Sequence, residues 1–364
     1  MQPKQPTSTR SRPWAVRPGF LVSLLVPAVL IASFRLGEIT GHVDLFAFLP
    51  LVVAYVVVPF HNRLVRQRLF GDAIGETGGV ARGAAPAYYR VVPLLALPAQ
   101  LAMLFFATDY WSTGGLGALG MLGTLGSTGL YSSLLAINTA HELIHRGTLL
   151  ERAIGGLLLS TVTFGSFKIV HLRVHHRFVG TRLDPSSARR GQNLYSFWLQ
   201  SVPGGIGEAW RAERATLASP RWWRSELLLW YGCSALWCTL AWSLAGITGV
   251  VFFLLQSLVA ILKLEMINYV QHYGLERRAV DGRFEPVTDR HSWSQEAHVT
   301  NLALFNLFRH ADHHANPGRP YEALRLRSQS PTYPLDVSLM VLLALVPPWW
   351  RRVVHPHLDA LPAA

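Results

Sequence analysis

Six apolar stretches, each long enough to cross a lipid bilayer, constrain this chain more than any other feature of its sequence. They cover residues 19–36, 44–60, 91–109, 116–138, 226–244 and 247–268. A membrane-spanning helix needs about 20 mostly apolar residues, because each residue adds only about 1.5 Å to its length. Of the 364 residues, 50% are hydrophobic and 15% are charged, whereas soluble domains carry about 25% charged residues. The sequence therefore predicts an all-α integral membrane protein with about six transmembrane helices.

Histidines cluster beside these stretches. Nine of the 15 histidines fall into four groups along the chain, namely His141 and His145; His171, His175 and His176; His272 alone; and His310, His313 and His314. Neutral imidazole is a common protein ligand for iron, copper and zinc. One ion accepts at most about four to six donors, so nine histidines predict two metal ions. Sequence alone does not choose among the three metals.

Two other apolar stretches are not expected to cross the bilayer. A crossing at 149–167 would put the first two histidine groups on opposite sides, so we predict an interfacial or re-entrant segment. Residues 336–350 are short and end in Pro-Pro-Trp-Trp, which indicates a segment at headgroup level with Trp349 and Trp350 in an aromatic belt. The predicted parts are a tail at 1–18, a membrane-embedded domain at 19–335 and an interfacial C-terminal segment at 336–364.

Basic residues predict the orientation. They concentrate before the first span and after the second, at Lys4, Arg10, Arg12, Arg17, Arg63, Arg66, Arg68, Arg82 and Arg90. Loops rich in lysine and arginine stay in the cytoplasm, so both termini and all four histidine groups are expected there, in a cytoplasmic cap. We predict a multi-pass protein of the bacterial inner (plasma) membrane. The net charge of +12 follows from this topology, and without a nucleic-acid-binding motif we expect no nucleic-acid partner.

The spacing of the histidines predicts how they are shared. His141 and His145 are four residues apart and lie on one helix face. Adjacent histidines, His175 with His176 and His313 with His314, point about 100° apart on a helix, so each pair can serve two ions. Two alternatives remain: a zinc peptidase with Glu142 as general base between His141 and His145, and a histidine-rich metal transporter, whose ligands would lie near the bilayer midplane.

Other polar residues near the histidines are expected to support them. Carboxylates that accept the outer N–H of a ligand imidazole fix its orientation and tautomer. The residues expected in supporting positions are Glu142, Asp184, Glu265, Asn268 and Asp312. An ion pair with Lys263 is the alternative for Glu265, and His291 is either a supporting or a surface residue. We interpret the remaining histidines as solvent or interface residues: His42, His61, His298, His355 and His357.

Several motifs resemble those of the integral-membrane alkane 1-monooxygenases, within the wider fatty acid desaturase/hydroxylase superfamily. They are Asn138-Thr-Ala-His-Glu-Leu-Ile-His145, Leu264-Glu-Met-Ile-Asn-Tyr-Val-Gln-His-Tyr-Gly-Leu275, Arg309-His-Ala-Asp-His-His-Ala-Asn-Pro-Gly-Arg-Pro-Tyr321, the His291-Ser-Trp triplet and Val179-Gly-Thr-Arg-Leu-Asp-Pro185. The similarity runs from about residue 130 to 330. The lone-histidine motif around His272 discriminates most, since plain desaturases typically carry three histidine boxes and lack it. Val170, Val174 and Gln271 stand where the family usually has Glu, Gly and Glu.

The resemblance implies a non-haem di-iron centre held by all nine clustered histidines, with no catalytic residue beyond it. It further implies O₂-dependent hydroxylation of a terminal C–H bond in an alkane or similar apolar substrate. Hydroxylation of alkylarenes or terpenes and desaturation of acyl chains are the alternatives within the superfamily. Cys233 and Cys238 lack metal-ligand spacing, so electrons must come from a separate rubredoxin or ferredoxin with its reductase.

Overall fold

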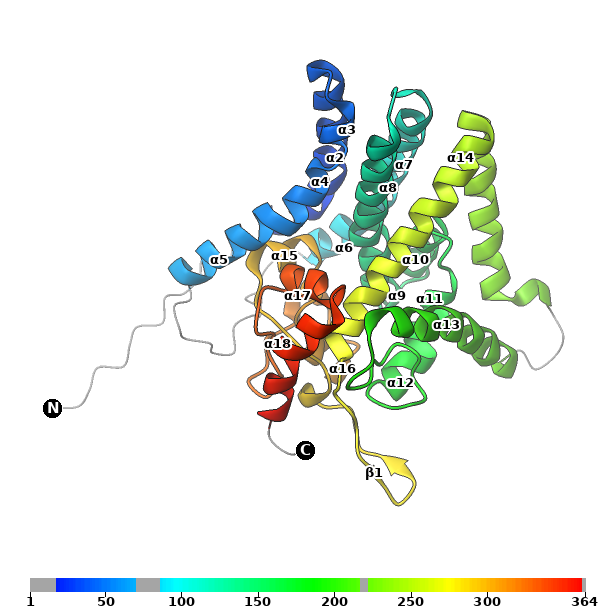
Figure 1. The fold of residues 1–364 in the computed structure, drawn as a ribbon. Helices are drawn as coiled ribbons and strands as arrows, with labels where there is room; N and C mark the ends of the chain where they lie inside the picture. The colour runs from blue at the N-terminus through cyan, green and yellow to red at the C-terminus, as the bar shows by residue number, and fades with distance from the viewer. Residues whose placement is uncertain (1–17, 70–85, 217–221, 362–364) are drawn as a thin grey trace.

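The computed structural model describes residues 18–69, 86–216 and 222–361, and these are mostly helical (Figure 1). Nearly all of the predicted tail, and some of the basic residues that predict the orientation, lie outside the described residues. The first elements are η1 (Pro18–Leu21), α2 (Val22–Thr40), α3 (Val43–Phe46), α4 (Leu49–Val52), η2 (Val53–Val57), α5 (Val58–Leu69), α6 (Pro86–Leu94), α7 (Ala96–Thr113), α8 (Ala118–Ser132), η3 (Ser133–Ile137) and α9 (Asn138–Ile144).

The second half of the chain contains shorter helices around one very long one. Its elements are α10 (Leu149–Ser160), α11 (Ser166–Val170), η4 (His171–His175), α12 (His176–Phe178), α13 (Leu194–Thr216), η5 (Trp222–Arg224), α14 (Glu226–His272), η6 (Asp289–His291), α15 (His298–Ala303), α16 (His310–Ala315), η7 (Tyr321–Ala323), α17 (Val337–Ala344) and α18 (Pro347–Asp359). Strands β1 (Ala279–Val280) and β2 (Arg283–Phe284) form a small antiparallel hairpin, a minor exception to the all-α prediction.

Among the described residues, four helices are long and apolar enough to cross a membrane: Gly19–Thr40, Val43–Leu64, Ala87–Thr113 and Glu226–His272. The last has non-helical backbone angles at Ala245 and Gly246, between the predicted spans 226–244 and 247–268, and Figure 1 shows its two arms side by side. The predicted span 116–138 corresponds to the continuous run of α8, η3 and α9, which is rich in glycine, serine and threonine and is not among the four. The protein is therefore a helical membrane protein.

Small residues let the central helices approach closely. A Cβ added at Gly129 of α8 would lie 2.5 Å from the Cβ of Val259 of α14, closer than two carbon atoms can come without strain. Behind this contact, Leu135, Ile137 and Leu143 pack with Leu158 of α10 and Leu264 of α14 in one apolar cluster. This cluster fixes the ends of α9 and α14, from which histidines project.

The C-terminal segment is packed into the protein. Val337 and Val341 of α17 are buried in a core cluster with Met266 and Val270 of α14. Trp350 is only 1% exposed, with its ring centre 5.1 Å from that of Tyr269 and 5.2 Å from that of Tyr273. The predicted aromatic belt is therefore wrong for Trp350, because the aromatic rings of α14 bury its indole, while Trp349 remains 65% exposed.

Candidate metal centre

The four histidine groups come from distant parts of the chain and meet below the long helices. His141 lies in α9 and His145 at its C-terminal end; His171 and His175 lie in η4 and His176 begins α12; His272 ends α14; and His310, His313 and His314 lie in α16. Figure 1 shows α9, α12, the end of α14 and α16 gathered in this region. All nine predicted histidines are thus brought to one site.

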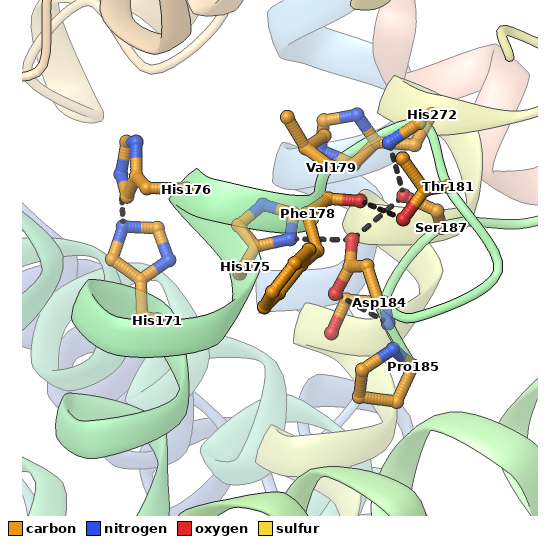
Figure 2. Close-up of polar contacts among 12 residues, drawn as sticks. His171, His175, His176, Phe178, Val179, Thr181, Asp184, Pro185, Ser187 and His272 are labelled. Carbon is orange, nitrogen blue, oxygen red and sulfur yellow. Dashed lines mark hydrogen bonds and ion pairs between the residues drawn. The ribbon is translucent and has the colours of Figure 1, made fainter. Parts of the chain in front are cut away.

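The nine histidines form two sets, within each of which one ligand atom per residue lies within 4.8 Å of every other. The first set is His141, His145, His171, His176 and His313, and the second is His175, His272, His310 and His314. Each adjacent pair is divided between the sets, as the helical spacing predicts. Figure 2 shows His176 turned toward His171 while His175 points away from both, toward Asp184.

The local backbone of the second group differs from an ordinary α-helix. Residues His171–His175 form a π-helical turn, η4, between α11 and α12. A π turn adds a residue to each turn and is frequent at functional sites. It brings His171 and His176, five residues apart, to an Nε2–Nε2 distance of 3.0 Å.

More ring nitrogens converge here than can satisfy one another by hydrogen bonding. The Nε2 atoms of His145, His171 and His176 are mutually 3.0 to 3.2 Å apart, and His313 Nε2 lies 3.2 Å from His176 Nε2. An imidazole nitrogen offers one proton or one lone pair, so such a group cannot be fully paired internally. The buried Nε2 of His141 has no hydrogen-bond partner among the residues that the structure describes. A shared cation satisfies all of these lone pairs.

The separations fit a metal ion. Two nitrogens at about 2.1 Å from one ion lie about 3.0 Å apart at a right angle and about 3.4 Å apart at a tetrahedral angle. In the second set, His310 Nε2 lies 3.2 Å from His272 Nε2 and 2.9 Å from His314 Nε2. Both sets therefore match the spacing of imidazoles around an ion.

Burial favours the neutral form of His145 and His171. Burial, together with the neighbouring His175, lowers the pKa of His145 to about 4. Burial and the neighbouring imidazoles lower the pKa of His171 well below its ordinary value. At neutral pH these rings carry the free lone pair that a metal requires.

Asp184 supports the second set from the loop after α12. Its Oδ2 lies 2.8 Å from His175 Nδ1 and accepts a hydrogen bond of 2.6 Å from Ser187 Oγ (Figure 2). Burial opposes ionisation, but the contacts with His175 and Ser187 hold the pKa of Asp184 below its ordinary value. The ionised carboxylate fixes the proton of His175 on Nδ1, so Nε2 faces the other histidines. Its position agrees with the supporting role predicted for it.

The other predicted supporting residues have different contacts. Glu142 pairs with Arg146 at 2.8 Å, and Arg146 also reaches Glu322 at 3.2 Å. Asp312 is bound by Arg319, Asn316 and the backbone N–H of Arg325. These contacts are with cationic and amide donors, so both carboxylates stabilise the cap around the histidines. An arginine-paired Glu142 does not suit the peptidase alternative, which needs a free base.

Glu265 and Asn268 are buried neighbours in α14, and Glu265 also faces Ser201 of α13. No ion pair joins Glu265 to Lys263 within the described part of the chain. His291 belongs to neither set: its Nδ1 accepts from Thr288 N–H at 3.0 Å and its Nε2 lies 3.3 Å from Glu285.

Sequence reasoning missed the serines on the loop from 292 to 294. Ser292 Oγ lies 3.4 Å from His272 Nδ1, and Ser294 Oγ accepts from the N–H of Ala311, next to His310, at 3.0 Å. The His291-Ser-Trp triplet is the signal, because Trp293 anchors it with an Nε1–H bond of 3.0 Å to the Tyr273 carbonyl. The serine, not the histidine, faces the ligand set.

Comparison with known proteins agrees with this geometry. A family model described as fatty acid desaturase matches residues 116–334. Alkane 1-monooxygenase 2 of Alcanivorax borkumensis is 39% identical over 343 residues, 93% of this chain and 89% of the relative. Alkane 1-monooxygenases 2 and 1 of Pseudomonas aeruginosa are 43% and 42% identical and cover 94% and 93% of this chain and 92% and 89% of their own lengths. The chain belongs to the alkane 1-monooxygenase family. It is an oxidoreductase, a membrane alkane hydroxylase with a histidine-rich metal site.

Replacing His141, His175, His272 or His313 by Ala should abolish hydroxylation and lower the metal content, because each contributes a ring nitrogen to one of the two sets. The same change at His42 or His357, outside both sets, should leave both quantities nearly intact. Metal analysis of purified protein and product measurement in membranes check this. Full metal loading and turnover in His272→Ala protein would remove the lone histidine from the site.

Replacing Asp184 by Asn should weaken metal binding by about 10- to 100-fold, the usual effect of losing a supporting carboxylate. Asp312→Asn is the matched control, because Asp312 is equally buried but contacts arginine. It should lower the thermal unfolding temperature without a comparable loss of metal affinity. Chelator competition measures the affinity, and equal losses in both variants would contradict the role given to Asp184.

Proposed function

We propose that this chain is an O₂-dependent, non-haem di-iron monooxygenase that hydroxylates the terminal C–H bond of alkanes or similar apolar substrates. The observation that carries the proposal is the pair of adjacent all-imidazole sets, in a chain about 40% identical to alkane 1-monooxygenases. The residues that would hold the two irons are His141, His145, His171, His175, His176, His272, His310, His313 and His314.

Two bound irons would supply the reductive activation of O₂, with one oxygen atom entering the C–H bond and the other leaving as water. The protein itself orients the histidines and shields them from water. Asp184 fixes the tautomer of His175, and Ser292 faces the outer nitrogen of His272. His272 is fully buried and His310 is 2% exposed, so bulk water is excluded from the second set.

An apolar cavity of about 240 Å³ supports an apolar substrate. Its walls come from α2, η2, α14, α15 and α17. Leu304 lines this cavity and also lines a small pocket beside His141 and His313. Each CH₂ group favours an apolar environment by about 0.8 kcal/mol, so an alkane concentrates in the bilayer. A chain that enters the cavity from lipid approaches the histidines past Leu304.

Hydroxylation of an alkyl-substituted arene is the second candidate. The xylene/toluene monooxygenase hydroxylase component of Pseudomonas putida is 28% identical over 239 residues, 62% of this chain and 62% of the relative. Its lower identity and coverage favour the alkane over the alkylarene as substrate.

Electrons are proposed to come from a separate rubredoxin or ferredoxin with its reductase. Forming an alcohol and water from O₂ and a C–H bond consumes two electrons and two protons. Cys233 and Cys238 are free cysteines inside α14 and cannot form an electron-transfer centre. Exposed arginines near the histidines, on the β1–β2 hairpin, its flanks and α18, would attract an acidic carrier: Arg278, Arg283, Arg290, Arg351 and Arg352.

The orientation is part of the proposal. We place six crossings in a bacterial inner membrane, with the two arms of α14 and the run from α8 to α9 as spans, and the histidine sets on the cytoplasmic face. Support comes from the arginine-free loop between α7 and α8, which lies at the opposite end of the helices from the histidine region (Figure 1).

The orientation predicts the reactivity of introduced cysteines in a chain whose Cys233 and Cys238 are replaced by Ala. Cysteine at Arg190 or Arg283, both exposed near the histidine side, should resist impermeant maleimide in intact cells and react in inverted vesicles. Ser112→Cys, exposed at the end of α7, should show the reverse pattern. Labelling of position 190 or 283 from outside intact cells would overturn the orientation.

The catalytic proposal predicts 1-alkanol from an alkane only when O₂, rubredoxin and its reductase are all present. Purified protein should contain iron in preference to zinc. Turnover at subsaturating donor should fall as salt rises from about 0.05 to 0.5 M, because the Debye length shrinks from more than about 10 Å to only a few Å. Sustained turnover without a donor protein would rule out the external electron source, and a zinc-loaded protein without hydroxylase activity would rule out the di-iron reaction.

A further inference from the structure

The apolar cavity contains one feature that an alkane does not require. Among the described residues that line it, Lys263 of α14 is the one with a charged side chain. Lys263 is 8% exposed. Within the described part of the chain its Nζ has no hydrogen-bond or ion-pair partner, and it lies 5.4 Å from the centre of the Tyr55 ring. A cation left unpaired in an apolar enclosure is costly unless a ligand supplies the opposite charge.

The nearest acidic residue along α14 does not supply that charge. Glu265 follows Lys263 by two residues, which places it about 200° around the helix. It faces Ser201 and Asn268 and is absent from the cavity walls. The ammonium is therefore aimed into the cavity with an aromatic ring as its protein contact, and a ring quadrupole compensates a buried cation only in part.

The rest of the lining restricts the ligand to one long apolar chain. Val26 and Val29 of α2, Leu130 of α8 and Val341 of α17 surround the space with aliphatic side chains. Lys263 lies nine residues, or about 13 Å of helix, before His272 at the end of α14. A bound amphiphile would therefore put its polar head at Lys263 and its tail along the aliphatic walls.

We propose that this cavity binds long-chain fatty acids, with the carboxylate held by the Lys263 ammonium beside Tyr55 and the alkyl chain against α2, α8 and α17. The carboxylate matches the cavity's charged side chain, and the chain matches its apolar walls. Given the proposed function, such an acid occupies the space of the alkane and inhibits its hydroxylation competitively. Further oxidation of the alkanol product yields a fatty acid. The enzyme would then be inhibited by a compound formed from its own product.

The test compares binding of four ligands with the same twelve-carbon chain to the purified full-length protein in an uncharged detergent. Radiolabelled dodecanoate should bind, and dodecyltrimethylammonium should fail to displace it. Lys263→Met should weaken dodecanoate binding by about tenfold or more, the usual loss for a charge-assisted hydrogen bond, without weakening the binding of dodecanol. Lys263→Arg should retain most of the affinity. Leu258→Met, which alters an exposed residue of the same helix outside the cavity lining, is the control and should behave like wild type.

Several results would overturn the proposal. Dodecanoate binding equal to wild type in Lys263→Met protein would place the carboxylate elsewhere, and loss of both dodecanoate and dodecanol would make Lys263 a support of the cavity. Tighter binding of dodecyl phosphate than of dodecanoate would assign the site to a phosphate headgroup. Binding requires no turnover, so these measurements test the site independently of the hydroxylase reaction. Only the predicted competition against alkane depends on both.

Discussion

Nine clustered imidazoles, seven of them buried, cannot satisfy one another's hydrogen bonding, and the rest of this structure depends on this constraint. An unpaired buried polar group costs roughly 1–3 kcal/mol. The Nε2 atoms of His145, His171 and His176 are all in mutual contact, and with one proton per ring they cannot all form hydrogen bonds to one another. Metal bound at these histidines would convert this conflict into a stabilising interaction. Metal binding should therefore contribute to folding, since the histidines come from α9, η4, α14 and α16.

The helices around the sets serve this convergence. Gly129 allows α8 to approach α14 closely at Val259. The helical run continues from α8 through η3 to α9, so this contact helps to position His141. The π turn η4 brings His171 close to His176 in the first set, while His175 belongs to the second set. Val170 and Val174, which differ from the residues usual in the family, pack in an apolar cluster with Ala209 and Leu227. Their packing therefore helps to hold the π turn in place.

The division of the histidines between two groups could be predicted from the sequence, because histidine spacing on a helix is a local property. The division of His175 from His176, and of His313 from His314, follows from an angle of about 100° between adjacent side chains. Supporting contacts depend on partners distant in sequence and were harder to predict. Asp184 reaches His175 across a short loop, but Glu142 pairs with Arg146, which also pairs with Glu322, and Asp312 pairs with Arg319. Trp350 was misplaced for the same reason: Tyr269 and Tyr273, about 80 residues earlier, bury it.

One short loop joins the apolar cavity to the metal centre. Phe305 and Asn306 have left-handed backbone angles, with φ of 52° and 59°, a conformation that costs free energy for a residue with a side chain and persists only when neighbours hold it. Asn306 is held by its amide to the Tyr321 carbonyl at 2.9 Å and by its N–H to the Asn301 carbonyl at 2.7 Å. This turn places Leu304 and Phe308 in the cavity wall and leads directly into His310. Because the same backbone positions substrate walls and a ligand, changes in cavity shape here also change the geometry at the metal.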